Sequence, residues 1–163
     1  MNVDRRAFLG FGGIGAAALL TGYWGGGSSR AAAETFQLNL SDAEWRRRLT
    51  PAQYATLRHA VTERPESSPL DHEHRKGTYL CAGCALPLYS SATKFDSGTG
   101  WPSFWKPLPN AVRTKSDREI GMERTEVHCR RCGGHLGHVF DDGPPPTHLR
   151  YCMNGIALRF APA

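Results

Sequence analysis

The chain has 163 residues, which is enough for one domain with a buried core and leaves little room for a second. Its formal net charge of +5 falls to +3 without the three arginines and one aspartate of residues 1–33, so the charge gives no reason to expect nucleic-acid binding. The 18 glycines and 11 prolines predict many turns, which is typical of a β-rich architecture.

Residues 1–33 have the pattern of a bacterial twin-arginine export signal. Arg5 and Arg6 precede a weakly apolar stretch rich in glycine and alanine, and the alanines that end at Ala33 suit a signal peptidase. The stretch is too short and too rich in glycine for a stable membrane span. We therefore predict export to the periplasm and a mature chain that begins at Glu34. The alternative is an uncleaved N-terminal anchor.

Two short helices are predicted at the start of the mature chain. Ser41 and Thr50 each begin a capping box, in which the Ser or Thr is followed three residues later by Glu or Gln, and a proline follows Thr50 at the first helical position. The second helix is expected to run to about Val61, with Tyr54, Leu57 and Val61 on one face.

A polar, proline-containing loop is expected at residues 65–76, and the pattern then changes to short apolar runs broken by Gly, Pro and Asp. No helical period is sustained after Gly77. Strands are expected at residues 78–80, 85–89, 126–128, 138–140 and 156–160. The sequence therefore predicts one mainly β domain over residues 34–163, with short helices at its N-terminus.

Four of the five cysteines form two C-x-x-C pairs, Cys81 with Cys84 and Cys129 with Cys132. Each pair can place two sulfurs about a metal ion from a tight turn, and two such turns complete a tetrahedral zinc site. The alternative is disulfide pairing, because an exported protein enters an oxidising compartment. Twin-arginine export carries proteins that have already folded, which permits zinc loading in the reducing cytosol. We therefore predict one structural zinc ion per chain.

The fifth cysteine, Cys152, lies outside both pairs. Arg150 is two residues before it and Asn154 two residues after it, so on a strand all three side chains project to one side. A cation there favours the thiolate, which is the nucleophilic form of cysteine. These residues alone leave a catalytic thiol and an inert or intermolecular thiol equally open.

Three longer motifs resemble the B-type methionine-R-sulfoxide reductases. They are KFDSGTGWPSF at residues 94–104, HLGHVFDDGP at residues 135–144 and RYCMN at residues 150–154. The likeness covers roughly residues 41–162 and includes both cysteine pairs. It implies two antiparallel sheets braced at one end by the zinc site, helices at the N-terminus, and reduction of the R epimer of methionine sulfoxide in proteins.

The resemblance also implies the residues of the active site. Cys152 matches the family's nucleophile, and Trp101 matches the aromatic wall against which the substrate's methyl group rests. The polar residues that match the family's site are His135, His138, Asp142, Arg150 and Asn154. In the implied reaction the Cys152 thiolate attacks the sulfoxide sulfur, His138 or His135 protonates the oxygen, and the cysteine ends as a sulfenic acid.

The chain departs from the family at two positions. Many members carry a second cysteine near the nucleophile, where this chain has Thr99. Because the other four cysteines are committed to zinc, no thiol remains to form an intramolecular disulfide with Cys152. An external thiol, from a small dithiol or a thioredoxin-like partner, is therefore expected to recycle the enzyme. The second departure is His148, where glycine is more usual.

Two functions of other classes fit parts of this pattern. Two C-x-x-C pairs alone are typical of a zinc-ribbon module that binds nucleic acid or protein, and an exported structural zinc domain would also contain them. The export signal, the weak positive charge and the unpaired Cys152 disfavour the zinc ribbon. Catalytic turnover distinguishes the enzyme from both alternatives.

Overall fold

A computed structural model describes residues 34–118 and 121–163. The predicted export signal at residues 1–33 lies outside the described residues. Within the described part of the chain, no helix is long and apolar enough to cross a membrane.

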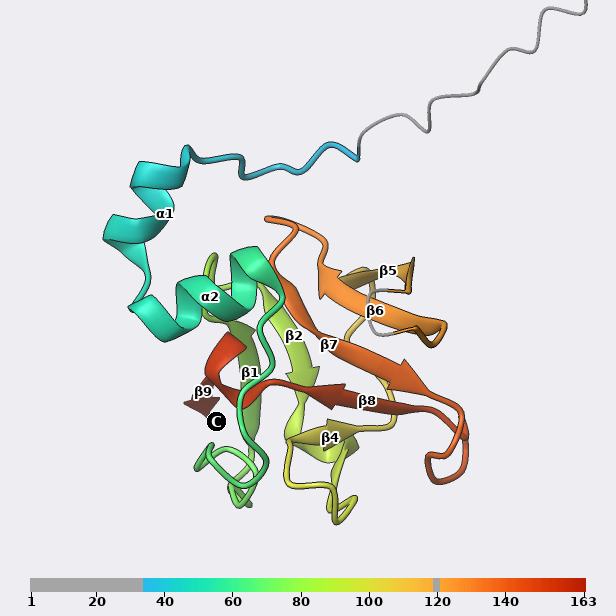
Figure 1. Ribbon diagram of the computed structural model, residues 1–163. Coiled ribbons are helices and arrows are strands. Elements are labelled where there is room, and N and C mark those ends of the chain that lie inside the picture. The colour runs from blue at the N-terminus through green and yellow to red at the C-terminus, as the bar shows by residue number, and fades with distance from the viewer. Residues whose placement is uncertain (1–33, 119–120) are drawn as a thin grey trace, which may run out of the picture. The chain divides into compact units, whose positions relative to one another are not determined.

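Two helices begin the described chain, α1 at Asp42–Arg48 and α2 at Pro51–His59 (Figure 1). Both predicted capping boxes are confirmed. The hydroxyls of Ser41 and Thr50 accept hydrogen bonds from the backbone N–H three residues on, and the side chains at those positions bond back to the cap. The local sequence therefore fixes where each helix starts.

The end of α2 differs from the prediction. Ala60 adopts a left-handed conformation, with φ 54°, and its N–H bonds back to the last turn, so the helix closes at His59. Val61 consequently lies outside the helix and is exposed, whereas Tyr54 and Leu57 are buried. The predicted shared face thus ends at Leu57.

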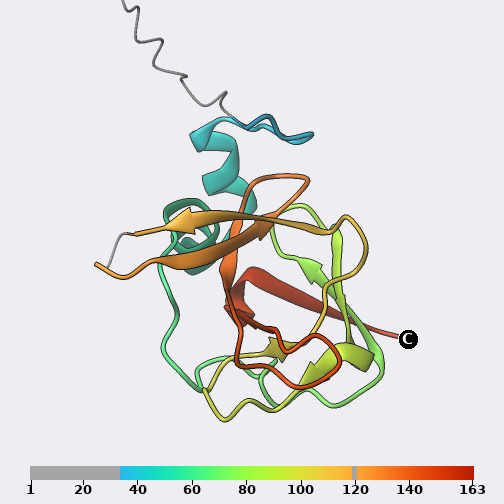
Figure 2. The same cartoon turned by 90° about the vertical axis from the view of Figure 1, so that its right-hand side faces the viewer.

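The rest of the described chain forms two antiparallel sheets, which confirms the predicted fold class. The smaller sheet has the order β2-β1-β9, with β1 at Gly77–Cys81, β2 at Pro87–Ser90 and β9 at Leu158–Pro162. The larger sheet has the order β3-β4-β8-β7-β6-β5. Its strands are β3 (Lys94–Phe95), β4 (Ser103–Phe104), β5 (Val112–Asp117), β6 (Arg124–Cys129), β7 (His135–Phe140) and β8 (Arg150–Met153). Figure 2 shows β9 running beside β1 to the C-terminus.

Short 3-10 turns precede β3, at Ser91–Thr93, and β9, at Gly155–Ala157. The second turn explains why the strand predicted at residues 156–160 begins only at Leu158. The strand predicted at residues 85–89 likewise begins later, at Pro87.

Buried aromatic rings join the two sheets. Tyr89 of β2 stacks on Phe104 of β4 with ring centroids 4.3 Å apart, and Tyr79 of β1 meets the same ring edge-on at 4.9 Å. All three residues are fully buried. Packed rings of this size bury much apolar surface, so this core holds the two sheets together.

Candidate active site and cysteine cluster

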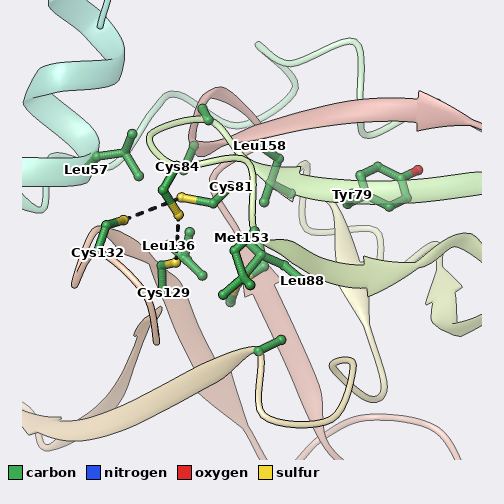
Figure 3. Close-up of a cluster of buried hydrophobic side chains, with 14 of the residues drawn as sticks. Leu57, Tyr79, Cys81, Cys84, Leu88, Cys129, Cys132, Leu136, Met153 and Leu158 are labelled. Atoms are coloured by element: carbon green, nitrogen blue, oxygen red, sulfur yellow. Dashed lines mark hydrogen bonds between the residues drawn. The ribbon is translucent and has the colours of Figure 1, made fainter. Parts of the chain in front are cut away.

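The four paired cysteines meet between the two sheets (Figure 3). Cys81 ends β1 of the smaller sheet and Cys129 ends β6 of the larger one, while Cys84 and Cys132 lie in the turns that follow. All four residues are buried and their sulfurs lie within 4.8 Å of one another. The Sγ atoms are 3.8 Å apart between Cys81 and Cys132, and 3.5 Å apart between Cys84 and Cys129.

These separations suit one tetrahedral metal ion. A zinc–sulfur bond of about 2.3 Å in tetrahedral geometry separates the sulfurs by about 3.8 Å. A disulfide bond of about 2.05 Å is much shorter, and all the cysteines are free.

The two turns that carry the cysteine pairs are closed by backbone hydrogen bonds. They run from Ala85 N to Cys81 O and from Gly133 N to Cys129 O, each 2.8 Å. Gly133 has φ 67°, and a Cβ there would collide with the ring of Phe36.

A separate pocket of about 150 Å³ contains Cys152. It is lined by Thr62, Trp101, Arg124, Gly137, His138, Phe140, Cys152 and Asn154. Strand register explains how these distant segments meet. Across the larger sheet, directly paired positions run from Ser103 of β4 to Cys152 of β8, His138 of β7, Glu126 of β6 and Lys115 of β5. Directly paired side chains share one face of a sheet, so this row brings the cysteine beside the histidine.

The Cys152 side chain is partly buried and has polar neighbours. Thr99 Oγ1 lies 3.8 Å from Cys152 Sγ, and Ser97 links Thr99 to Ser103 through hydroxyl contacts of 2.8 and 2.7 Å. Burial raises the pKa of the Cys152 thiol, while hydrogen bonds from Thr99 and Ser103 and the charge of Arg150 oppose the rise. Arg150 thus favours the thiolate as expected, but burial outweighs its effect and the pKa of Cys152 stays above its ordinary value.

Arg150 forms a two-point ion pair with Asp142. Its Nε and Nη2 atoms donate to the two carboxylate oxygens of Asp142, each over 2.8 Å, and its guanidinium carbon lies 4.4 Å from the centroid of Phe140. The hydrogen bond from Arg150 lowers the pKa of Asp142. Asp142 is mostly exposed, and neither Asp142 nor Arg150 lines the pocket, so the pair lies beside the Cys152 pocket and not in it.

The two predicted histidines occupy different positions. His138 lines the Cys152 pocket, and its Nε2 lies 2.7 Å from Asp117 Oδ2, which also accepts a 2.5 Å hydrogen bond from Arg124. Burial lowers the pKa of His138, although the hydrogen bond with Asp117 opposes the change. A neutral imidazole is therefore favoured near neutral pH.

His135 packs against His138, with the two ring centroids 5.4 Å apart, but it does not line the Cys152 pocket. Its Nδ1 is 2.9 Å from Glu126, whose other oxygen pairs with Lys115 at 2.8 Å. Burial alone would raise the pKa of Glu126, but the hydrogen bonds with His135 and Lys115 lower it to about 2. Each histidine is thus paired with its own carboxylate.

Trp101 and Asn154 are joined through Glu63. The indole of Trp101 donates to the Glu63 carbonyl over 3.2 Å, and Asn154 Oδ1 accepts from the Glu63 N–H over 3.0 Å. Asn154 also donates to the Leu136 carbonyl over 3.1 Å and is almost fully buried. Asn154 therefore fixes the walls of the pocket through the backbone.

Several residues of this region were missed at the sequence level, namely Thr62, Glu63, Lys115, Asp117, Arg124 and Glu126. A usable signal exists for four of them. Lys115 and Asp117 alternate on one strand, Arg124 and Glu126 on the next, and opposite charges pair across the hairpin.

The departure at His148 also has a physical meaning, because its φ of 58° lies in the left-handed region where glycine is favoured.

The chain is similar to known proteins over most of its length. The SelR domain family matches residues 49–162. A protein named peptide methionine sulfoxide reductase MsrB from Agrobacterium fabrum is 55% identical over 127 residues, which are 77% of this chain and 94% of that protein. Proteins of the same name from Bradyrhizobium diazoefficiens and Leptospira interrogans are 56% identical over 123 residues and 52% identical over 126 residues. These matches cover 75% and 77% of this chain, and 88% and 96% of those proteins.

Proposed function

The chain belongs to the B-type methionine-R-sulfoxide reductases, oxidoreductases that return methionine-R-sulfoxide to methionine, and we propose that it does so through a sulfenic acid on Cys152. The observation that carries this proposal is the pocket in which Cys152, His138 and Trp101 meet. A zinc-ribbon module has no need of such a pocket.

The proposed reaction begins with a proton transfer inside the pocket. His138 takes the proton of the Cys152 thiol, and the thiolate attacks the electrophilic sulfur of the sulfoxide. His138 then gives this proton to the sulfoxide oxygen. The attack joins Cys152 Sγ to the substrate sulfur. The protonated oxygen then passes to Cys152 Sγ while the new sulfur–sulfur bond and the sulfur–oxygen bond of the substrate both break. Methionine is released, methionine sulfoxide has been reduced by two electrons, and Cys152 has been oxidised by two, to the sulfenic acid.

The apolar part of the pocket holds the methyl group. We propose that Trp101 contacts it through surface area and sulfur–aromatic attraction. Its indole is fixed by the bond to Glu63, so little rotamer freedom is lost on binding. Arg150, paired with Asp142, supplies the nearby positive charge that opposes the rise in the pKa of Cys152.

We propose one structural zinc ion held by Cys81, Cys84, Cys129 and Cys132. Four thiolates fill the coordination of zinc, so the bound ion supplies a cross-link between the two sheets. None of these cysteines lines the Cys152 pocket.

We also propose that residues 1–33 direct export and are removed after Ala33. The twin arginines support export, and Glu34 supports the cleavage position. Its carboxylate pairs with Arg113 at 2.6 Å and with His128 at 3.0 Å, so cleavage would leave an N-terminus that stays attached to the sheet. N-terminal sequencing of protein from the periplasmic fraction tests this, and an intact Met1 there would contradict it.

The test of the function is an assay on free and peptide-bound methionine sulfoxide, with dithiothreitol as the reductant. The purified protein is expected to consume the R epimer and to leave the S epimer unchanged, with one methionine formed per sulfoxide lost. The S epimer is the internal control. Failure to consume either epimer would contradict the enzyme and favour a binding or structural zinc domain.

Recycling by an external thiol leads to a prediction at Thr99. Because Thr99 Oγ1 lies 3.8 Å from Cys152 Sγ, the variant Thr99→Cys is expected to form a disulfide with Cys152 after one turnover. The unmodified protein is expected to stop at the sulfenic acid, which an added thiol captures as a mixed disulfide. Mass spectrometry after a single turnover without reductant distinguishes these states.

The control for this experiment is Ser116→Cys, which adds an exposed thiol on β5, outside the Cys152 pocket. It is expected to behave like the unmodified protein. An intramolecular disulfide in the unmodified protein would contradict external recycling, because it would require a thiol from the cysteine cluster.

A further inference from the structure

A second cleft borders the Cys152 pocket. It has a volume of about 240 Å³, and His138 and Arg124 line both cavities. Its other titratable lining residues include Asp117, Glu126 and His135. His138 therefore stands between the apolar pocket that suits the substrate and a polar cleft built from β5, β6 and β7.

Asp117 is placed at this boundary by strand register. It is paired with Arg124 across the β5–β6 hairpin, and its Oδ2 atom contacts both His138 Nε2, at 2.7 Å, and Arg124 Nη2, at 2.5 Å. The side chains of Asp117 and His138 are each only 10% exposed. Burying a carboxylate costs free energy even when it is paired. Stability alone therefore does not explain why Asp117 lies beside His138.

The contact also selects one tautomer of the histidine. A neutral imidazole carries a single N–H, and a carboxylate can only accept, so the bond to Asp117 places that hydrogen on Nε2. The other ring nitrogen, Nδ1, is then the proton acceptor. Cys152 lies directly opposite His138 in the neighbouring strand.

We propose that Asp117 is a positioning residue for the reductase reaction. Asp117 holds His138 in one tautomer, in which Nδ1 carries no hydrogen. This Nδ1 can then take a proton from Cys152 and pass it to the sulfoxide oxygen. The inference rests on the proposed function of His138 and extends it to a residue that does not touch substrate. Glu126 performs no such task, because it pairs with His135, which lies outside the pocket.

The remaining charges about His138 fix the direction of the pH effect. Arg124 and Glu126 face it from β6, His135 from its own strand and Cys152 from β8. Arg124 and His135 lower the pKa of His138, whereas Asp117 raises it. In the proposed reaction Cys152 and His138 together carry one proton, so uptake of a second proton by this pair, with His138 as the acceptor, sets the acid limb of the pH profile. Loss of Asp117 moves that limb to lower pH.

The first test is Asp117→Asn, measured as kcat/KM for R-sulfoxide reduction between about pH 5 and pH 10. We expect a loss of about 100-fold at neutral pH, because the amide can stabilise the wrong tautomer, together with a shift of the acid limb to lower pH. The matched control is Glu123→Gln. It removes the same charge from the same hairpin, but Glu123 is exposed and pairs with Arg118, so its profile should be unchanged.

A double-mutant cycle with His138→Gln separates positioning from a general structural effect. If Asp117 acts through His138, Asp117→Asn costs little additional activity once His138 is absent. Asp117→Glu is the second variant, because it keeps a carboxylate for Arg124 while displacing it from the histidine. It is expected to fold, with unchanged metal content, and to show a smaller loss with the same pH behaviour.

Two results would overturn the positioning role: an acid limb that stays in place in both Asp117 variants, or an equal loss from Asp117→Asn with and without His138. A different result bears on the proposed function. If His138→Gln alone kept full activity, the proton-transfer role of His138 would fail, whatever the Asp117 variants did.

Discussion

Replacing Cys152 by serine is expected to abolish reduction of R-methionine sulfoxide, by at least about 10³-fold, while the fold and the metal content stay unchanged. A serine hydroxyl is a far weaker nucleophile than a thiolate at neutral pH. Serine also cannot accept the oxygen of the sulfoxide, because it has no equivalent of the cysteine sulfenic acid. The change is small in volume, and Cys152 contributes nothing to the cysteine cluster. Methionine production, elemental analysis and thermal unfolding measure the three properties separately.

Thiol labelling provides the control for this result. The native protein is expected to take up one alkylating group, on Cys152, because the other four cysteines are buried. Labelling should inactivate the native protein, and the serine variant should take up none. More than a trace of activity in Cys152→Ser would contradict the nucleophile assignment.

The features that could be predicted from the sequence have local signals. A capping box fixes the start of each helix within four residues, and a C-x-x-C turn specifies two ligands without knowledge of the fold. The end of α2 lacked such a signal, because alanine at position 60 adopts a conformation usually marked by glycine. Strands β3 and β4 are too short for any period to be recognised.

Strand β5 shows why Lys115 and Asp117 were missed. Its sequence, VRTKSD, is polar and its side chains are mostly exposed, so no apolar alternation marks it as a strand. Pairing with β6 forms it instead, and that register places Asp117 beside His138. A register shift between Val127 and His128 further determines which histidine meets Glu126. The alternating charges of β5 and β6 indicate that these two strands pair, but which histidine each carboxylate contacts depends on the register of the assembled sheet.

Loss of a zinc ligand is expected to have the largest effect on stability. Cys81→Ser and Cys129→Ser each remove one of the thiolates that join β1 of the smaller sheet to β6 of the larger one. Metal-binding energy in small zinc domains is on the order of 10 kcal/mol, and a domain's whole stability is about 5–15 kcal/mol. Both variants should therefore unfold or aggregate at temperatures where the native protein is stable.

Removal of the metal from the unmodified protein should act in the same direction, because zinc binds the folded state and stabilises it by mass action. A strong chelator is expected to lower the unfolding temperature, and added zinc to restore it. Cys152→Ser is the matched control, since it removes a thiol without removing a ligand and should respond to the chelator like the native protein. If freshly purified protein contained no zinc and its paired cysteines were disulfide-bonded, the cluster would be an oxidised cross-link, and the two sheets would be held by covalent bonds that a chelator leaves intact.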